Sequence, residues 1–394
     1  MTKLINLKIF PHFFKSSSAG GILLVLCVVT SLLIANTGWA NAFTELLNTE
    51  AGFEVNNFHL RYPVLLWIND GLMAIFFLLV GLEIKREVAE GELSSVKQAS
   101  LPVLAAVGGV IVPAVIYSVF NSSNAFTAKG WAIPMATDIA FALGILSLLG
   151  SKVPTGLKVF LAALAIADDL LAIMVIAIFY SSQLHYDYLA YASAIFILQI
   201  IFNRIGIKNI AFYVIPGMVM WYFIHHSGIH ATIAGVLTAL AVPTNEDVAE
   251  SPLEKLEHFL TRPVNFIIMP IFALANTNIT FEAGMLHGLA GTMGLGILFG
   301  LVVGKPVGIV AMSWLSVKLN ISKLPVGTNW IHVIGLGLLG GIGFTMSIFI
   351  ALLSFNDTAH QNEAKFAVLT ASVIAGTTGF LLLNTYNKRQ KHTG

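Results

Sequence analysis

Apolar stretches of about 20 residues, the length that an α-helix needs to cross the hydrocarbon core of a bilayer, recur along the whole sequence. Hydrophobic residues make up 57% of the chain and charged residues 10%, whereas about a quarter of an average soluble domain is charged. The sequence therefore predicts an all-α polytopic membrane protein with one integral domain over residues 1–394. We expect about twelve transmembrane helices, near residues 17–35, 64–87, 100–121, 126–148, 155–180, 187–203, 210–225, 228–242, 259–276, 289–316, 328–355 and 363–386.

The composition also excludes several classes of function. A formal net charge of +1 provides no basic surface for nucleic acid. The single cysteine, Cys27, excludes an intrachain disulfide and a cysteine-rich metal site. No cofactor is expected, and the lipid bilayer is the expected environment.

The first apolar segment has two interpretations. Lys3, Lys8 and Lys15 precede it and residues 40–42 (Ala-Asn-Ala) resemble a signal-peptidase site, which would fit a cleaved signal peptide. The apolar run is longer than the usual core of a signal peptide, so we interpret it as the first transmembrane helix.

Basic residues in the connections predict the orientation, because they are concentrated in cytoplasmic loops. Of the 21 basic residues, Arg61, Lys129 and Lys365 fall on one side of the membrane, Lys305 falls inside it, and the others fall on the side of the N-terminus. Both termini are therefore expected in the cytoplasm. The connection around 47–63 is then external, and a partly alternating pattern within it favours a small hairpin.

Two predicted helices are interrupted. Pro134 lies inside the fourth, where a proline removes a backbone donor and clashes with the preceding turn, so the helix should break there. Matching interruptions in two halves are typical of transporters built from inverted repeats, here about 100–180 and 289–386, with the ion site where the broken helices cross. Glycines also help membrane helices to pack, so they alone are weak evidence. The eleventh helix contains a dense group of them: Gly335, Gly337, Gly340, Gly341 and Gly343.

Two acidic residues, Asp168 and Asp169, are neighbours within the apolar run 159–180. A charged Asp at the bilayer centre costs at least about 2.5–3.5 kcal/mol on the insertion scale, so the pair indicates a functional site. Adjacent carboxylates repel each other, and at least one should take up a proton near neutral pH. Neighbours on a helix point about 100° apart, so the two should have different partners. Such a pair can hold protons or a metal ion.

Three motifs resemble the NhaA family of bacterial sodium/proton antiporters. They are residues 136–142 (ATDIAFA), 165–170 (AIADDL) and 303–306 (VGKP), and the resemblance extends from the first helix to the last. It implies an electrogenic, pH-regulated exchange of Na⁺ or Li⁺ for H⁺ by alternating access in the bacterial inner membrane. It also implies a homodimer, with residues 50–63 as the contact, although a free hairpin is equally compatible with the sequence.

The resemblance implies roles for individual residues. Asp168 and Asp169 would bind the cation and the protons, with Asp168 near Lys305 and Asp169 at the bottom of a cytoplasmic funnel. Thr137 and Asp138 would lie beside the helix crossing, where Asp138 would offset positive helix N-ends and Lys305 negative C-ends. A plain buried salt bridge with Asp168 is the alternative role for Lys305. Either Asp168 or Lys305 would carry the second of the protons that are exchanged for one sodium ion.

Other ionisable residues are candidates for the pH response, namely Glu83, Glu87, Glu257, His258, His230 and Asp70. Glu83 and Glu87 would instead be a solvated helix end if they paired with Lys85 or Arg86. Thr261 stands where some relatives have a titratable residue, and packing is a plain alternative role for His230. A zinc site at His225, His226 and His230 is not expected, because acidic ligands are not near in the sequence.

Three other classes of protein contain acids in the membrane. An intramembrane aspartyl protease would need two facing acids, but its Gly-x-Gly-Asp motif is absent and Lys305 would be an unusual neighbour. A sodium-coupled solute symporter would need a solute for sodium uptake. A cation channel would pass current without proton coupling.

Overall fold

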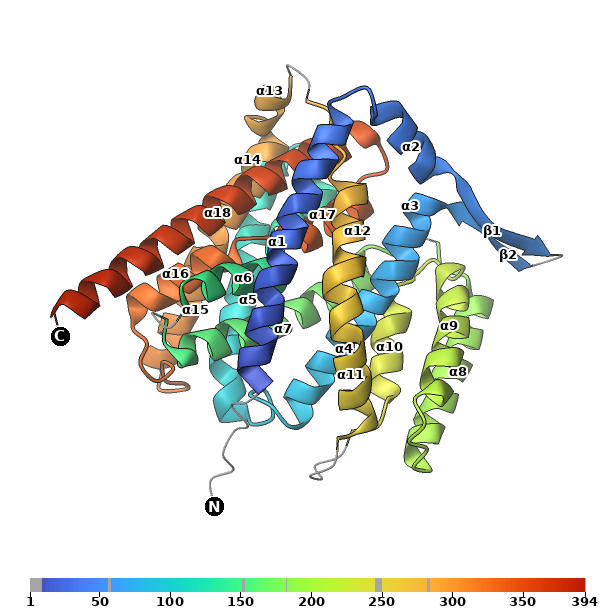
Figure 1. Ribbon diagram of the computed structural model, residues 1–394, viewed down its shortest axis with the longest axis horizontal. Helices are drawn as coiled ribbons and strands as arrows, with labels where there is room; N and C mark the ends of the chain where they lie inside the picture. The colour runs from blue at the N-terminus through green and yellow to red at the C-terminus, as the bar shows by residue number, and fades with distance from the viewer. Residues whose placement is uncertain are drawn as a thin grey trace.

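The computed structural model describes residues 9–55, 58–150, 153–181, 183–244, 250–281 and 284–393. Apart from one two-stranded hairpin, the secondary structure of these residues is helical (Figure 1). By length and apolar composition, seven described helices can cross a membrane, and two bent helix pairs raise that number to nine. The predicted all-α membrane fold is confirmed.

Each of the predicted apolar segments is helical. In the first half these are α1 (Ile9–Ala35), the continuous α3 (Val64–Leu66), η1 (Trp67–Leu72) and α4 (Met73–Ala89), α5 (Val96–Asn121), η2 (Thr127–Met135) with α6 (Ile139–Leu148), α7 (Thr155–Phe179) and α8 (Tyr186–Arg204). In the second half they are α9 (Ala211–His225), α10 (Ile233–Ala241), the continuous α11 (Pro252–Pro263), η4 (Val264–Ile268) and α12 (Met269–Asn276), α14 (Thr292–Phe299), η5 (Gly300–Gly304) and α15 (Lys305–Lys318), α16 (Trp330–Gly340) with α17 (Phe344–Ser354), and α18 (Thr358–Thr393). The nine spans do not include α8, α9 or α10, so about twelve crossings remain a prediction.

Three spans contain a π-helical turn, namely η1, η4 and η5. Such turns are rare and are frequent at functional sites. η1 contains Asn69 and Asp70, η4 contains Asn265, and η5 directly precedes Lys305. Each turn therefore places a polar side chain at a local irregularity of an otherwise apolar span.

The fourth span breaks where Pro134 predicts it. The segment before the break, η2, is a 3₁₀-helix rather than an α-helix, and the backbone is extended at Ala136 (φ −81°, ψ 151°) before α6 begins. The eleventh span bends by 44° between α16 and α17, at the glycine-rich segment. The amide of Asp138 donates a hydrogen bond to the carbonyl of Ile342 (2.7 Å), so the two breaks lie side by side.

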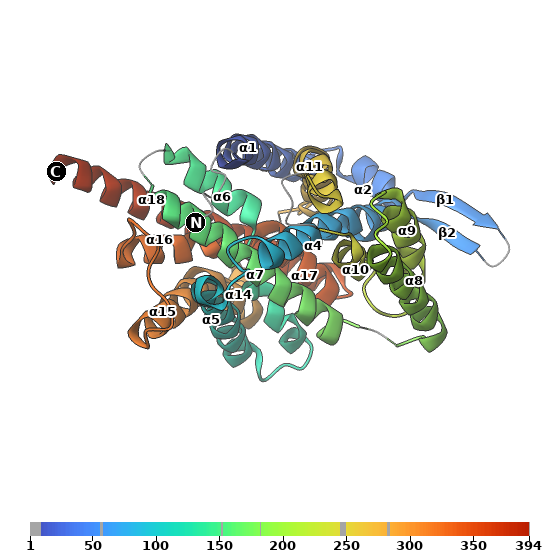
Figure 2. The ribbon, with the colours of Figure 1, turned by 90° about the horizontal axis from the view of Figure 1, so that it is seen from below.

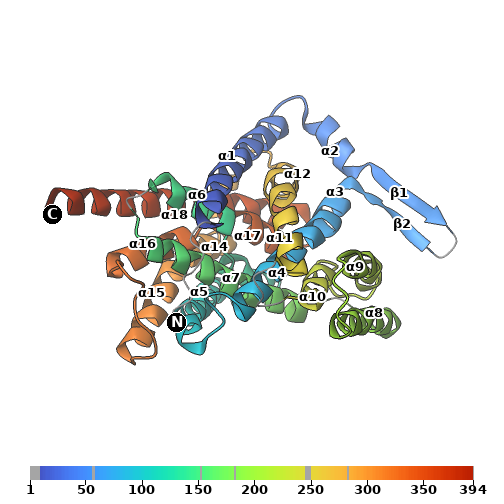
Figure 3. The same ribbon diagram turned by 60° about the horizontal axis from the view of Figure 1, so that its bottom comes forward.

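Helix α7 lies in the middle of the molecule, with α8 and α9 at one end and the end of α18 at the other (Figures 2 and 3). On one side of this centre, α5 packs against α15 through a reciprocal glycine contact. A Cβ on Gly308 would lie 2.0 Å from the carbonyl oxygen of Gly108, and a Cβ on Gly108 would lie 2.2 Å from that of Gly308. Only a residue without a side chain allows this approach.

We expect Gly308→Ala to destabilise the protein, because the added methyl group would overlap the backbone of α5. Overpacking of a tight contact costs about 1–3 kcal/mol, and thermal unfolding in detergent measures the loss. Gly38→Ala is the matched control, because nothing lies within 4 Å of a Cβ at that position. Equal melting temperatures for the two variants would contradict this packing.

The predicted hairpin is present. Strands β1 (Glu50–Val55) and β2 (Phe58–Pro63) pair antiparallel, with Glu50 opposite Pro63 and Phe53 opposite Leu60, and the hairpin projects from the helical body (Figure 1). The preceding helix α2 (Ala40–Asn48) was not predicted, because this segment reads as part of a polar connection. Helix α2 buries Leu47, and α13 (Met285–Leu289) is a second short helix in a connection.

Candidate functional site

The carboxylate of Asp138 binds the N-ends of both helices that begin at the crossing, α6 and α17. Asp138 is the N-cap of α6, and its Oδ1 accepts a hydrogen bond from the amide of Phe141 (3.0 Å). Its Oδ2 accepts hydrogen bonds from the amide of Thr345 (3.1 Å) and from the Thr345 hydroxyl, at the start of α17. Helix N-ends carry partial positive charge and unpaired amides, which an anionic acceptor satisfies.

The helix C-ends of the same crossing receive hydrogen-bond donors. Thr137 Oγ1 donates to the carbonyl of Gly340, the last residue of α16, at 2.8 Å. The ammonium group of Lys305 donates to the carbonyl of Met135, the last residue of η2, and to Asp168 Oδ2 at 2.6 Å. Lys305 is fully buried, so the membrane interior holds a cation between a carboxylate and a helix C-end.

The acid pair of α7 has two different environments. Asp168 faces Lys305, whereas Asp169 lines a cavity together with Asp138 and Thr137. Both aspartates are buried, with 1% and 4% of their surface exposed. Among the described residues, Oδ1 of Asp168 and Oδ1 of Asp169 have no hydrogen-bond partner. These two oxygens are therefore buried without a hydrogen-bond donor, although Lys305 offsets the charge of the Asp168 carboxylate.

The cavity beside Asp169 has a volume of about 50 Å³. A water molecule needs roughly 10–15 Å³ of such volume, so the cavity has room for a few waters or a partly dehydrated small cation. Its polar lining comes from five spans and includes Glu83 of α4 and Thr345 of α17. Gly20 of α1 and Asn265 of η4 also line it. Hydroxyl, carboxylate and carboxamide oxygens are the ligands that hard cations prefer.

A separate ionic cluster joins α4 to α11. Arg86 Nη1 lies 2.7 Å from Glu257 Oε1, and Arg86 Nη2 lies 3.2 Å from Glu87 Oε1. Glu87 thus pairs with Arg86, but the alternative pairing with Lys85 is not formed. Lys85 instead donates to two carbonyl groups at the end of α10. His258 forms an exposed pair with Glu250 (2.6 Å) and is not part of the Arg86–Glu257 bridge.

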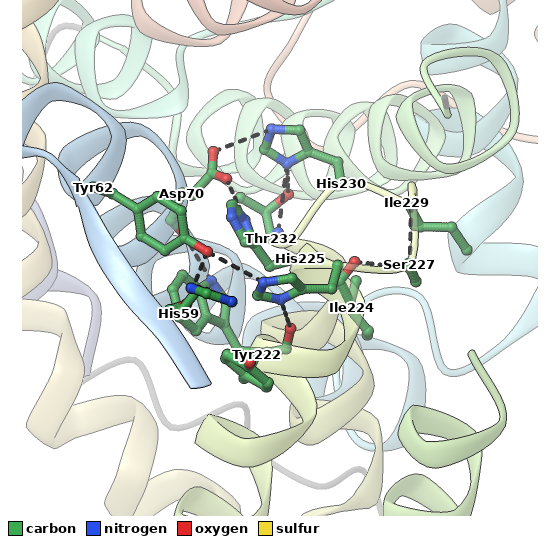
Figure 4. A network of polar contacts seen from close by, with 12 residues as sticks. His59, Tyr62, Asp70, Tyr222, Ile224, His225, Ser227, Ile229, His230 and Thr232 are labelled. Carbon is green, nitrogen blue, oxygen red and sulfur yellow. Dashed lines mark hydrogen bonds and ion pairs between the residues drawn. The ribbon is translucent and has the colours of Figure 1, made fainter. Parts of the chain in front are cut away.

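The histidines between α9 and α10 have an acidic neighbour, contrary to the expectation from sequence. Asp70, in the π-turn η1, lies between His225 (Oδ2 to Nδ1, 3.0 Å) and His230 (Oδ1 to Nε2, 3.5 Å), as Figure 4 shows. His230 also contacts the hydroxyl of Thr232 at 2.8 Å. Across the described ranges, no group of three or more His, Cys, Asp or Glu side chains could hold a metal ion, so this cluster is a hydrogen-bonded network.

Two polar residues of the crossing or the cavity were not singled out from the sequence. Thr345 follows the glycine-rich break, and its position directly after Gly343-Phe344 was a usable signal for a helix N-end. Asn265 is the lone polar residue between Pro263 and Pro270 in an apolar run. That pattern indicates an irregular helix, but not the cavity that the residue faces.

Comparison with known proteins identifies the family. Residues 11–383 match the family model described as Na⁺/H⁺ antiporter 1. The chain is 71% identical to Na(+)/H(+) antiporter NhaA 2 of Flavobacterium johnsoniae, over 99% of this chain and 96% of that protein. It is 50% identical to the NhaA of Flavobacterium psychrophilum, over 95% of each chain, and 46% identical to that of Citrobacter koseri, over 96% of this chain and 98% of that protein. The chain therefore belongs to the NhaA family and is a multi-pass membrane Na⁺/H⁺ antiporter.

Proposed function

We propose that Asp168 and Asp169 form the exchange site, which holds either a Na⁺ or Li⁺ ion or protons. The observation that supports this most is the buried, unpartnered oxygen on each of the two carboxylates. A buried carboxylate without a counter-ion is unstable as an anion. Asp168 has Lys305 as its counter-ion, whereas Asp169 has none among the described residues and therefore requires a proton or a cation. The site cannot hold the cation and the protons at the same time. This competition couples the sodium gradient to the proton gradient.

Asp169 is the main cation ligand in this proposal. It is the member of the pair that lines the cavity, together with Thr137 and Asp138. These residues offer only oxygen atoms, which suits Na⁺ and Li⁺. Asp138 has a second role, because its carboxylate already accepts bonds from the N-ends of α6 and α17.

Lys305 stabilises the cation-free state through its bridge to Asp168 and its bond to the carbonyl of Met135. If the bridge joins an ammonium group to a carboxylate, cation binding opens it and Lys305 releases the second proton. In the alternative, Asp168 is protonated before the cation binds and releases that proton itself. Exchange of more than one proton per Na⁺ moves net charge, and each charge is worth about 2.3 kcal/mol per 100 mV. The exchange is then electrogenic.

Alternating access would come from one bundle rocking against the other around the crossing. The repeats are about 100–180 and 289–386, and the reciprocal contact of α5 with α15 supports this pairing.

We also propose that the protein is pH-regulated. The first candidate cluster for the pH response lies at the cytoplasmic end. The bridge of Arg86 with Glu87 and Glu257 supports it, and Glu83 and His258 are assigned to the same cluster. The second candidate cluster is His230 with Asp70.

The protein is further proposed to be a homodimer of the bacterial inner membrane with cytoplasmic termini. The excess of basic residues on the side of the N-terminus supports this orientation. The projecting hairpin supports the dimer, because all six residues of β1 are exposed in the monomer. A second hairpin placed beside it would bury these residues.

Electrogenic exchange can be tested in proteoliposomes that contain Na⁺, a pH dye and equal K⁺ on both sides. Dilution into sodium-free buffer should acidify the interior, and valinomycin should accelerate the acidification because it removes the opposing potential. An unchanged rate with valinomycin would contradict electrogenic exchange. Sodium efflux that required an added solute and did not acidify the interior would favour a symporter.

A further inference from the structure

The irregular turn η4 leaves a backbone carbonyl without its helical donors. In an α-helix the carbonyl of Asn265 would accept a bond from residue 269, and in a π-helix from residue 270. The amide of Met269 is bonded to the carbonyl of Val264 instead. Residue 270 is a proline, which has no N–H. Neither donor therefore reaches the carbonyl oxygen of Asn265.

The side chain of the same residue is also available. Asn265 is half-buried and lines the cavity that contains Asp169 and Glu83. In the part of the chain that the structure describes, its carboxamide makes no hydrogen bond. A carboxamide without a partner in an apolar span is costly unless water or an ion solvates it. Its neighbours on the turn, Val264 and Phe266, are apolar.

The wall opposite this turn is a glycine. Gly20 of α1 lines the same cavity, and a Cβ placed on it would lie 3.5 Å from the carbonyl oxygen of Asn265. Because Gly20 has no side chain, that oxygen is not covered from this direction. Asn265 thus borders the same cavity as the acidic residues Glu83 and Asp169.

We propose that Asn265 is a further cation ligand, which binds Na⁺ or Li⁺ through its carboxamide oxygen and its carbonyl oxygen in the cavity that Asp169 also lines. This inference rests on the proposed exchange site at Asp168 and Asp169. Carbonyl oxygens at helix irregularities are common Na⁺ ligands in transporters. A neutral ligand replaces water around the cation without adding charge, so Asn265 sets the affinity for the cation and leaves the proton-binding carboxylates unchanged.

The test compares two substitutions of similar size in the full-length protein. Asn265→Leu removes the side-chain oxygen, whereas Asn265→Asp keeps one. In proteoliposomes with varied Na⁺ or Li⁺, we expect Asn265→Leu to raise the apparent KM for both ions about 2- to 10-fold, the effect of one neutral polar contact, with little change in the maximal rate. Asn265→Asp should not raise the apparent KM.

Ile267→Ala is the control on the same turn, because Ile267 is 55% exposed. It should leave the apparent KM unchanged. If Asn265→Leu does not fold, Asn265→Ala removes the same oxygen without added bulk and should raise the KM equally. An unchanged KM in the variant without the oxygen would overturn the proposal, and so would an equal rise in Asn265→Asp or Ile267→Ala.

Asp169→Asn measured in parallel separates this inference from the exchange site itself. Loss of exchange in Asp169→Asn with an unchanged KM in Asn265→Leu would reject only the role of Asn265. Normal exchange in Asp169→Asn would reject the proposed site, whatever Asn265→Leu does.

Discussion

Asp168→Asn and Asp169→Asn should each reduce sodium-driven proton movement to the rate of vesicles without the protein. Either change removes a charge that the cation needs and a group that exchanges a proton. An amide keeps the size of the side chain, so the fold should be preserved. Everted vesicles with a pH-sensitive dye measure the exchange.

Asp187→Asn is the matched control for these variants. Asp187 lies in the first turn of α8, where it is exposed, so its neutralisation should leave exchange at the wild-type rate. Wild-type rates in Asp168→Asn or Asp169→Asn would reject the assignment of that residue. The same loss in the control would show that the assay reports damage to the protein in general.

Lys305→Met should strongly destabilise the protein. The change leaves Asp168 buried without its cation and the carbonyl of Met135 without its donor. Removing one partner of a buried ion pair typically costs about 3–5 kcal/mol. Thermal unfolding in detergent at alkaline pH, where an unpaired carboxyl group is most often charged, measures the loss.

The double variant Lys305→Met with Asp168→Asn tests the cause of this loss. It removes both charges, so much of the stability should return even though exchange stays absent. A double variant as unstable as Lys305→Met alone would show that the bridge does not account for the effect. The contact with Met135 would then be the main contribution.

The two helix breaks were predictable because the responsible residues act locally. Pro134 lacks an N–H, and the glycines near residue 340 add no side-chain constraint, so each favours a break locally. A proline alone does not decide it, because Pro102 and Pro113 lie inside the unbroken α5. The 3₁₀ form of η2 was not predictable, because a proline indicates a break but not the geometry of the turns before it. The π-turns were missed for the same reason.

Contacts between distant segments were the least predictable part of the site. Asp70 and His230 are 160 positions apart, and only the packing of the second span against α9 and α10 brings them together. Arg86 and Glu257 likewise meet across two spans. The pairing of Asp168 with Lys305 was expected only through the family resemblance, because spacing in the sequence does not show which helices adjoin.

Family membership also decides between the alternative classes. The relatives are Na⁺/H⁺ antiporters along essentially the full chain, so the protein is a transporter and not a protease. Asp138 also lacks the role that a protease would require, because its two oxygens are bonded to helix N-ends.

Calorimetry of Na⁺ binding to the detergent-solubilised protein is the most direct test of competition at the acid pair. Titrations in two buffers with different ionisation enthalpies give the number of protons released per bound Na⁺. The account predicts that more than one proton leaves the wild-type protein for each Na⁺, and that Asp169→Asn neither binds Na⁺ nor releases protons. Binding of Na⁺ without proton release would contradict it.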